Sequence, residues 1–104
     1  RGRVFIEPRV QRFAQMMGVN VETISIIDLK NRWASCSDKR PKVNFNWKIM
    51  MAPVSVINYL IVHELAHFKY KRHSKDFWNE VDKIVPDYQK QVQWLKEYGA
   101  GLDV

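Results

Sequence analysis

The most regular hydrophobic pattern in the chain lies between residues 54 and 68. One helix face carries Ile57, Leu60, Ile61, Leu65 and Phe68, and the other faces carry Val54, Val56, Val62 and Ala66. A helix that is apolar nearly all round is buried at the centre of a domain. Because Pro53 has the backbone angle of a first helical turn, the pattern predicts a central helix that begins there.

Three further segments show helical periodicity. Apolar residues recur at this spacing from Pro8 to Gly18, which predicts an amphipathic helix that starts near the proline and stops at the glycine. Ser74 can cap a helix that ends before Pro86. A last helix follows Pro86, and we expect it to stop at Gly99.

Two segments are rich in β-branched residues and predict strands, over residues 23–29 and residues 43–47. We expect them to form an antiparallel pair, joined by an ordered connection over residues 31–41. Together with the helices, this pattern predicts an α+β fold in which a small antiparallel sheet packs on the central helix, with helices on its flanks.

The composition supports one domain. With 104 residues, 46% of them hydrophobic and 12% aromatic, the chain has material for a single core over residues 1–104. Since the first residue is Arg1 and not methionine, we expect a fragment of a longer protein. Cys36 is the only cysteine, which excludes an internal disulfide and a zinc finger and favours a cytoplasmic location. No apolar run is long enough to predict a membrane span.

Two histidines stand four residues apart within the central helix. His63 and His67 therefore lie one turn apart on the same face, where both imidazoles can reach one ion at roughly 2.0–2.1 Å, the Zn–N distance. Glu64 points in a neighbouring direction, which suits a base that takes a proton from water held at the ion. This is the HExxH pattern, although two satisfied core histidines and a glutamate at the rim would have the same spacing.

A catalytic zinc site usually has a third protein ligand and leaves the fourth position for water. His73 is the main candidate, but on an unbroken helix it would lie about 15 Å along the axis from His63. We therefore expect the helix to end between Phe68 and Arg72. The alternatives are Glu80 as a ligand from the next helix, or no ligand role for the third histidine, which would then lie on the surface. We expect one Zn²⁺ per chain.

Positive charge gathers near the third histidine, in a chain whose net charge is +6. The basic residues concerned are Lys69, Lys71, Arg72 and Lys75. They can contact a nucleotide, a nucleic acid or an acidic peptide. Lysines at the end of a helix also suit its dipole, so a purely solvated helix end is an equal alternative. We retain Lys69, Lys71 and Arg72 as candidate substrate-binding residues.

The connection between the two predicted strands contains a second candidate substrate-binding segment. Trp33 and Cys36 fit a role as core residues under the sheet. Alternatively, Trp33, Ala34 and Ser35 border the cleft and offer an edge to which an extended peptide adds as a strand. Nothing near Cys36 in the sequence activates its thiol as a nucleophile.

Five short motifs occur along the chain: Arg32-Trp33-Ala34-Ser35-Cys36-Ser37, Asn46-Trp47, Val62-His63-Glu64-Leu65-Ala66-His67, His73-Ser74 with Phe77-Trp78, and Pro86-Asp87-Tyr88. In this order and spacing they resemble the YgjP-like metallopeptidase-type family and, more distantly, the SprT-like zincins. The resemblance covers about residues 24–99. It implies a compact zincin-like fold with zinc held by His63, His67 and His73, and with Glu64 as the catalytic base. Two features differ: Ala34 stands where the family commonly has glycine, and the family's amino-terminal β-rich region is missing.

Three functions are compatible with these features. The one we favour is a zinc-dependent peptidase, which acts on a peptide or protein and uses Glu64 as general base. The second is zinc-assisted hydrolysis of phosphoanhydride bonds in a nucleotide, although the sequence has no Gly-rich phosphate loop. The third is a nucleic-acid- or protein-binding module with a structural zinc. Glu64 argues against it, because a purely structural zinc site does not need a buried carboxylate that is not a ligand. The sequence leaves the oligomeric state open.

Overall fold

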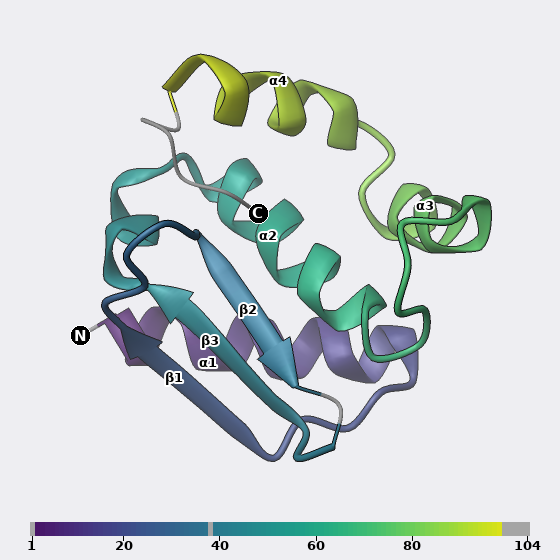
Figure 1. Cartoon of the computed structure of the whole chain (residues 1–104), viewed down its shortest axis with the longest axis horizontal. Helices are drawn as coiled ribbons and strands as arrows, with labels where there is room; N and C mark the ends of the chain where they lie inside the picture. Colours follow the sequence, from purple (N-terminus) through teal and green to yellow (C-terminus); the bar gives the residue numbers. More distant parts are fainter. Residues whose placement is uncertain (1, 38, 99–104) are drawn as a thin grey trace.

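The computed structural model describes residues 2–37 and 39–98, and its central element is helix α2 (Val54–Ala66). This helix contacts α1 (Gly2–Met17), α3 (Lys75–Ile84), α4 (Tyr88–Tyr98) and strand β2 (Ala34–Ser37). Figure 1 shows α2 between α1 and α4, with α3 near its carboxyl end. Ten of its 13 residues are buried. The prediction of a buried central helix is confirmed, and Pro53 is its N-cap, one residue before the first turn.

The sheet has three strands in the order β1 (Thr23–Ile27), β3 (Lys42–Asn46) and β2. β1 pairs with β3 in parallel, and β2 pairs with β3 in antiparallel orientation. The prediction that residues 23–29 and 43–47 form an antiparallel pair is therefore wrong. Because β2 lies in the connection between them, the chain reverses twice, and β3 runs in the direction of β1. The α+β class is confirmed, with a mixed sheet.

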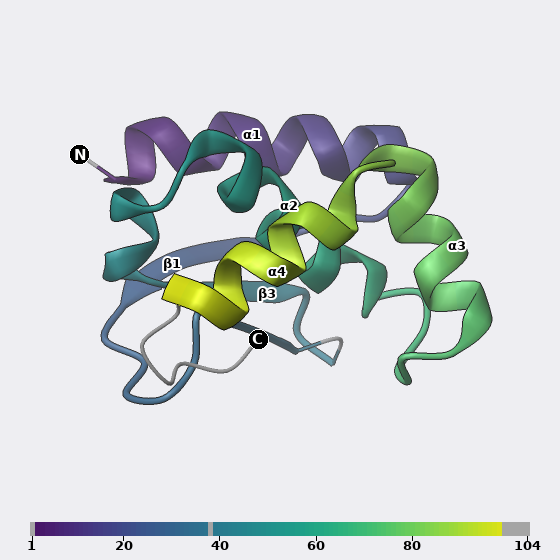
Figure 2. The same ribbon diagram turned by 90° about the horizontal axis from the view of Figure 1, so that it is seen from above.

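Helix α1 runs behind the sheet in Figure 1 and also packs along α2, as the view from above in Figure 2 shows. It begins at Gly2, although the sequence predicted a start near Pro8. A proline inside a helix removes one backbone hydrogen bond. The helix continues through it because Ile6 and Val10, on either side, are fully buried against the core. Gly18 ends the helix as predicted, with a positive φ of 72°.

A buried asparagine at the end of β3 fixes the connection from β1 to β2. The Nδ2 atom of Asn46 donates to the carbonyl oxygens of Leu29 and Arg32, at 2.6 and 2.9 Å. Its Oδ1 atom accepts from the backbone N–H of Lys48 and caps the 3₁₀ helix η1 (Trp47–Met51). This one side chain therefore holds together the strand end, the crossing connection and the approach to α2.

The carboxyl-terminal half follows the sequence prediction. Ser74 caps α3, its Oγ accepting from the N–H of Phe77 at 3.3 Å, and α3 ends before Pro86. The predicted stop of the last helix, Gly99, lies outside the described residues. In the described part of the chain, no helix is both long and apolar enough to cross a membrane.

Candidate metal centre

The end of α2 brings the third histidine back toward the first two. The α-helical segment ends at Ala66, slightly before the predicted interval, and tight turns continue through residue 69. The N–H groups of Lys69 and Tyr70 both donate to the carbonyl oxygen of Ala66, which closes the last turn. The chain then passes to the capped start of α3. This reversal places His73 beside the helix it has just left.

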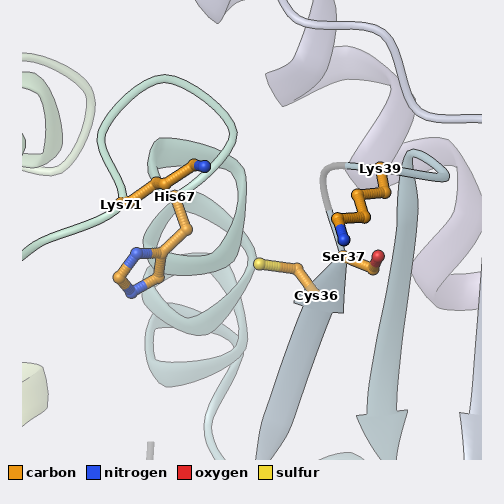
Figure 3. A pocket seen from close by; sticks show the side chains of 5 residues that line it. All are labelled: Cys36, Ser37, Lys39, His67 and Lys71. Carbon is orange, nitrogen blue, oxygen red and sulfur yellow. The ribbon is translucent and has the colours of Figure 1, made fainter.

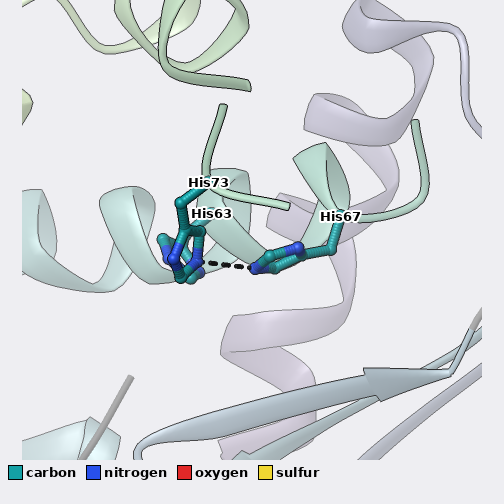
Figure 4. A group of neighbouring side chains, drawn as sticks. All are labelled: His63, His67 and His73. Atoms are coloured by element: carbon teal, nitrogen blue, oxygen red, sulfur yellow. Dashed lines mark hydrogen bonds between the residues drawn. The ribbon is translucent and has the colours of Figure 1, made fainter. Parts of the chain in front are cut away.

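The three histidines form one cluster, which Figure 4 shows. One ring nitrogen from each of His63, His67 and His73 lies within 4.8 Å of the other two. The Nε2 atoms of His67 and His73 are 3.1 Å apart. Two nitrogen ligands of a tetrahedral ion at about 2.05 Å lie roughly 3.3 Å apart, so this spacing fits a shared metal. The cluster runs from buried His63 to exposed His73 and is open to solvent on one side.

The ring orientations leave nitrogen lone pairs available for a metal. The Nδ1 atom of His67 lies 3.2 Å from the carbonyl oxygen of Tyr70. When Nδ1–H donates to that oxygen, Nε2 carries the lone pair and points at His73, the arrangement by which outer-shell carbonyls orient metal ligands. Burial, followed by the charge of His63, lowers the pKa of both His67 and His73. Both rings are therefore held in the neutral form that binds a metal.

Glu64 is buried beside the cluster, with only 3% of its surface exposed. Its Oε2 atom lies 3.3 Å from Nδ1 of His63. The carboxylate is therefore next to the metal-binding face of α2 without being one of the three clustered ligands. This is the position in which a general base can reach a water molecule at the centre.

Aromatic residues that the sequence interpretation left without a role line the cluster. The Phe77 ring packs 4.6 Å from the His67 ring, and the Trp78 ring lies 5.7 Å from the His73 ring. Tyr59 stands one helical turn before His63, with the ring centroids 5.7 Å apart. Burial, and then the negative charge of Glu64, raises the pKa of Tyr59 above its usual range, so its phenol stays protonated. The four-residue spacing from the first histidine was the signal that could have found this tyrosine.

Glu80, the alternative third ligand, is placed differently. It is buried, and its Oε2 atom lies 3.2 Å from the Nζ atom of Lys69, with Lys83 at 3.9 Å from its other oxygen. It does not belong to the group of clustered metal-binding side chains among the described residues. The geometry therefore pairs Glu80 with a lysine and places His73 at the cluster.

The candidate substrate-binding residues separate into two groups. The ammonium of Lys69 contacts Glu80 and the carbonyl oxygen of Met17, at 3.2 and 3.4 Å, and so joins α1, α3 and the end of α2. Arg72 is exposed on the turn. Lys71 lines a cavity of about 430 Å³ beside the cluster, with Cys36, Ser37, Lys39 and His67 (Figure 3). Of these three basic residues, only Lys71 thus lines the cavity beside the histidine site.

Trp33 is buried, as the core interpretation predicted, whereas Cys36, the other residue of that interpretation, is only partly buried. Ala34 is also buried, and Ser35 lies partly buried with its Oγ accepting from Asn44. β2, which begins at Ala34, is nevertheless an edge strand, because it is last in the strand order of the described residues. The N–H of Asn46 donates to the carbonyl of Trp33, and antiparallel pairing alternates along the strand. The backbone groups of Ala34 therefore point away from β3, toward the side on which α2 lies.

This fold, with three clustered imidazoles and a buried glutamate on the helix that carries the first two of them, defines a zincin-like metallopeptidase domain. The chain belongs to the YgjP-like metallopeptidase domain family, whose model matches residues 1–98. Its role as a metallopeptidase-type hydrolase, with a metal at its centre, follows from this membership.

Two of the solved structures that resemble the chain are metallopeptidase zymogens. The metallopeptidase zymogen of Pyrococcus abyssi abylysin has a TM-score of 0.82 and 23% identity over 95% of this chain and 99% of that one, which establishes the shared fold. The metallopeptidase zymogen of Methanocaldococcus jannaschii jannalysin has a TM-score of 0.71 and 29% identity over 86% and 96%. No curated protein sequence matches the chain.

Proposed function

We propose that the protein is a zinc-dependent peptidase whose metal is held by His63, His67 and His73. The observation that carries this proposal is the approach of three imidazole nitrogens to within 4.8 Å, with a buried glutamate on α2 next to the first of these histidines. Three nitrogen ligands and no thiolate fit zinc, and three protein ligands leave a position open for chemistry. A structural site would instead be closed by a fourth side chain.

When bound, zinc acts as a Lewis acid on the peptide carbonyl and makes water a stronger acid. The protein supplies the proton transfer: the Glu64 carboxylate accepts a proton from the attacking water and then donates it to the leaving amine nitrogen. The aromatic rings of Phe77 and Trp78 restrict the motion of the histidines on one side. They also limit the access of bulk water to the site, which strengthens its electrostatic interactions.

The substrate we propose is a peptide that lies extended along the outer edge of β2. Strand addition of this kind uses the outward-facing backbone groups of an edge strand. Because Ala34 is fully buried, the peptide would lie along the partly exposed end of β2, from Ser35 to Ser37. Because β2 contacts α2, a peptide on that edge passes alongside the face that carries the histidines. Trp33, which precedes β2, is buried, so it would help to position the strand and would not contact the peptide directly.

The substitution Glu64→Gln tests the mechanism. Glutamine keeps the shape and hydrogen bonding of the side chain but cannot accept the proton. We expect metal-dependent peptide turnover to fall by about 10²-fold or more, with zinc content unchanged. Turnover is measured on a peptide library with zinc-loaded protein, and zinc by elemental analysis of the same samples.

The matched control is Glu22→Gln, which removes an exposed carboxylate outside the site and should leave turnover unchanged. If Glu64→Gln loses its zinc, Glu64 is a ligand and not a base. If its turnover equals that of the unmodified protein, the carboxylate has no part in the reaction.

A further inference from the structure

His73 is held in a different way from His67, the neighbouring histidine of the cluster. The Nδ1 atom of His67 lies 3.2 Å from the carbonyl oxygen of Tyr70, and a partner of this kind usually orients the ring of a metal ligand. In the described part of the chain, the ring of His73 packs against two aromatic rings of α3, with centroid distances of 5.0 Å to Phe77 and 5.7 Å to Trp78. Ring packing therefore contributes to the orientation of this histidine.

The start of α3 explains why one of these rings lies beside His73. Ser74 is the N-cap, so His73 occupies the position before the cap and Trp78 is the fourth residue of the helix. Side chains at these two positions meet across the first turn, and their contact, a hydrophobic staple, fixes the angle at which the chain enters a helix. The backbone closes the same turn, because the N–H of Trp78 donates to the carbonyl oxygen of Ser74 at 3.1 Å. The helix start therefore brings the imidazole and the indole together.

Trp78 is itself supported by a second helix. Its ring stacks on that of Tyr88, the first residue of α4, with the centroids 5.2 Å apart and the planes 18° from parallel. It also meets the ring of Phe77 edge to face at 5.0 Å, and Phe77 is fully buried. Aromatic pairs at these distances stabilise a structure beyond the apolar area that they bury. Trp78 thus joins the first residue of α4 to the ring of His73.

We propose that Trp78 is a positioning residue of the metal centre: supported by Tyr88, it holds the His73 imidazole so that its Nε2 atom faces His67, 3.1 Å from the Nε2 atom of that residue. The inference rests on the proposed role of His73 as a metal ligand. Without this support, the exposed imidazole turns more freely, and part of the binding energy is spent on ordering it. Helix α4, which adds no side chain to the cluster of three, therefore contributes to metal affinity through Trp78.

The experiment measures zinc affinity, by competition with a chromophoric chelator, in Trp78→Leu, in Tyr88→Leu and in the double variant. Leucine keeps an apolar side chain but has no flat ring. We expect Trp78→Leu to lower zinc affinity about tenfold, within the roughly 10–100-fold range for residues that orient metal ligands. Tyr88→Leu, which leaves the indole in place, should lower it by a smaller factor. The double variant should lose no more than Trp78→Leu alone, because Tyr88 acts through Trp78 and the two effects are coupled.

The visible spectrum of Co²⁺, bound in place of zinc, reports the geometry of the ligands without any use of activity. Trp78→Leu should change this spectrum at saturating metal, and Trp78→Phe, which keeps a ring, should restore the spectrum and most of the affinity. The matched control is Trp94→Leu, which removes a half-buried ring of α4 that packs on Trp33, at 6.5 Å between centroids. It should lower the melting temperature but leave zinc affinity and the Co²⁺ spectrum unchanged. Melting in chelator shows that each variant is folded before titration.

Several outcomes overturn the inference. If Trp78→Leu binds zinc with full affinity while His73→Ala does not, the proposed metal site stands and the positioning role of the indole is wrong. If Trp94→Leu lowers zinc affinity as much as Tyr88→Leu does, the effect is one of general stability and not of the stack. If the losses of the two leucine variants multiply in the double variant, Tyr88 does not act through Trp78. If His73→Ala itself keeps full affinity, the proposed ligand set fails and the inference with it.

Discussion

His73 and Glu80 were both candidates for the third ligand position, and the two side chains now have different partners. The imidazole lies 3.1 Å from a second histidine, whereas the carboxylate lies 3.2 Å from the ammonium of Lys69. A group that already neutralises a lysine is a poor ligand for a cation unless that pair breaks. We therefore propose the ligand role for His73 and a structural role for Glu80, and the two proposals predict opposite results.

Substitution of His73 by alanine should lower zinc affinity by more than the 10–100-fold that changes in outer-shell partners cost, because it removes a direct ligand. Glu80→Gln should leave zinc affinity nearly unchanged but lower the melting temperature, since it leaves Lys69 without its ion-pair partner. Zinc affinity is measured by competition with a chromophoric chelator. Retention of full affinity in His73→Ala, together with its loss in Glu80→Gln, would reverse the two assignments.

At the residue scale, the spacing rules predicted that His63 and His67 lie together, but they did not predict the contacts of the lysines. His63 and His67 follow from the pitch of one helix, and such local geometry is contained in the sequence. Lys69 has a long, flexible side chain, and its partners include the carbonyl of Met17, which is 52 residues away. No local sequence pattern predicts a contact over that separation. The sequence alone therefore could not distinguish this structural contact of Lys69 from a substrate-binding role.

Among the elements, the start of α3 is the one that positions the third histidine. Ser74 follows His73 directly and accepts a hydrogen bond from the N–H of Phe77. We expect Ser74→Ala to lower the free energy of unfolding by about 1 kcal/mol, the usual cost of losing a capping side chain, and to weaken zinc binding because the preceding residue becomes less fixed. Denaturant unfolding with and without zinc measures both effects.

Two further variants make this prediction specific. Ser74→Asp should restore the cap, because aspartate accepts the same hydrogen bond. Ser55→Ala, at an exposed site in the first turn of α2, is the control and should change neither quantity appreciably. A loss of stability without any change in zinc affinity would show that the cap supports α3 but does not position His73.

The strands show why element-level prediction was incomplete. The strand segments were located from β-branched residues, but β2 has the sequence Ala-Ser-Cys-Ser, which carries no β propensity. It is a strand because Ala34 and Cys36 pair with Phe45 and Val43, both fully buried. Missing β2 also reversed the inferred direction of β3, since orientation depends on the number of turns between strands. The helices were better predicted because their caps and periodicity are local.

For the whole molecule, the metal would join two parts of the chain. His63 and His67 belong to α2, and His73 belongs to the segment that leads into α3. A bound ion therefore links the central helix to the carboxyl-terminal half at the point where the chain leaves the core. The unfolded chain does not hold the three imidazoles within 4.8 Å, so the ion binds the native state preferentially.

Removal of the metal should therefore destabilise the entire fold. At a free zinc concentration 100 times the dissociation constant, preferential binding adds about 2.7 kcal/mol to the free energy of unfolding. For a domain of this size, that corresponds to a melting temperature roughly 10–20 °C higher than in chelator. Differential scanning calorimetry over a series of zinc concentrations measures the shift, which should grow with the logarithm of concentration. The His63→Ala variant, which lacks a buried histidine of the cluster, should show little increase in melting temperature with zinc. A shift of equal size in that variant would place the stabilising metal at a different site.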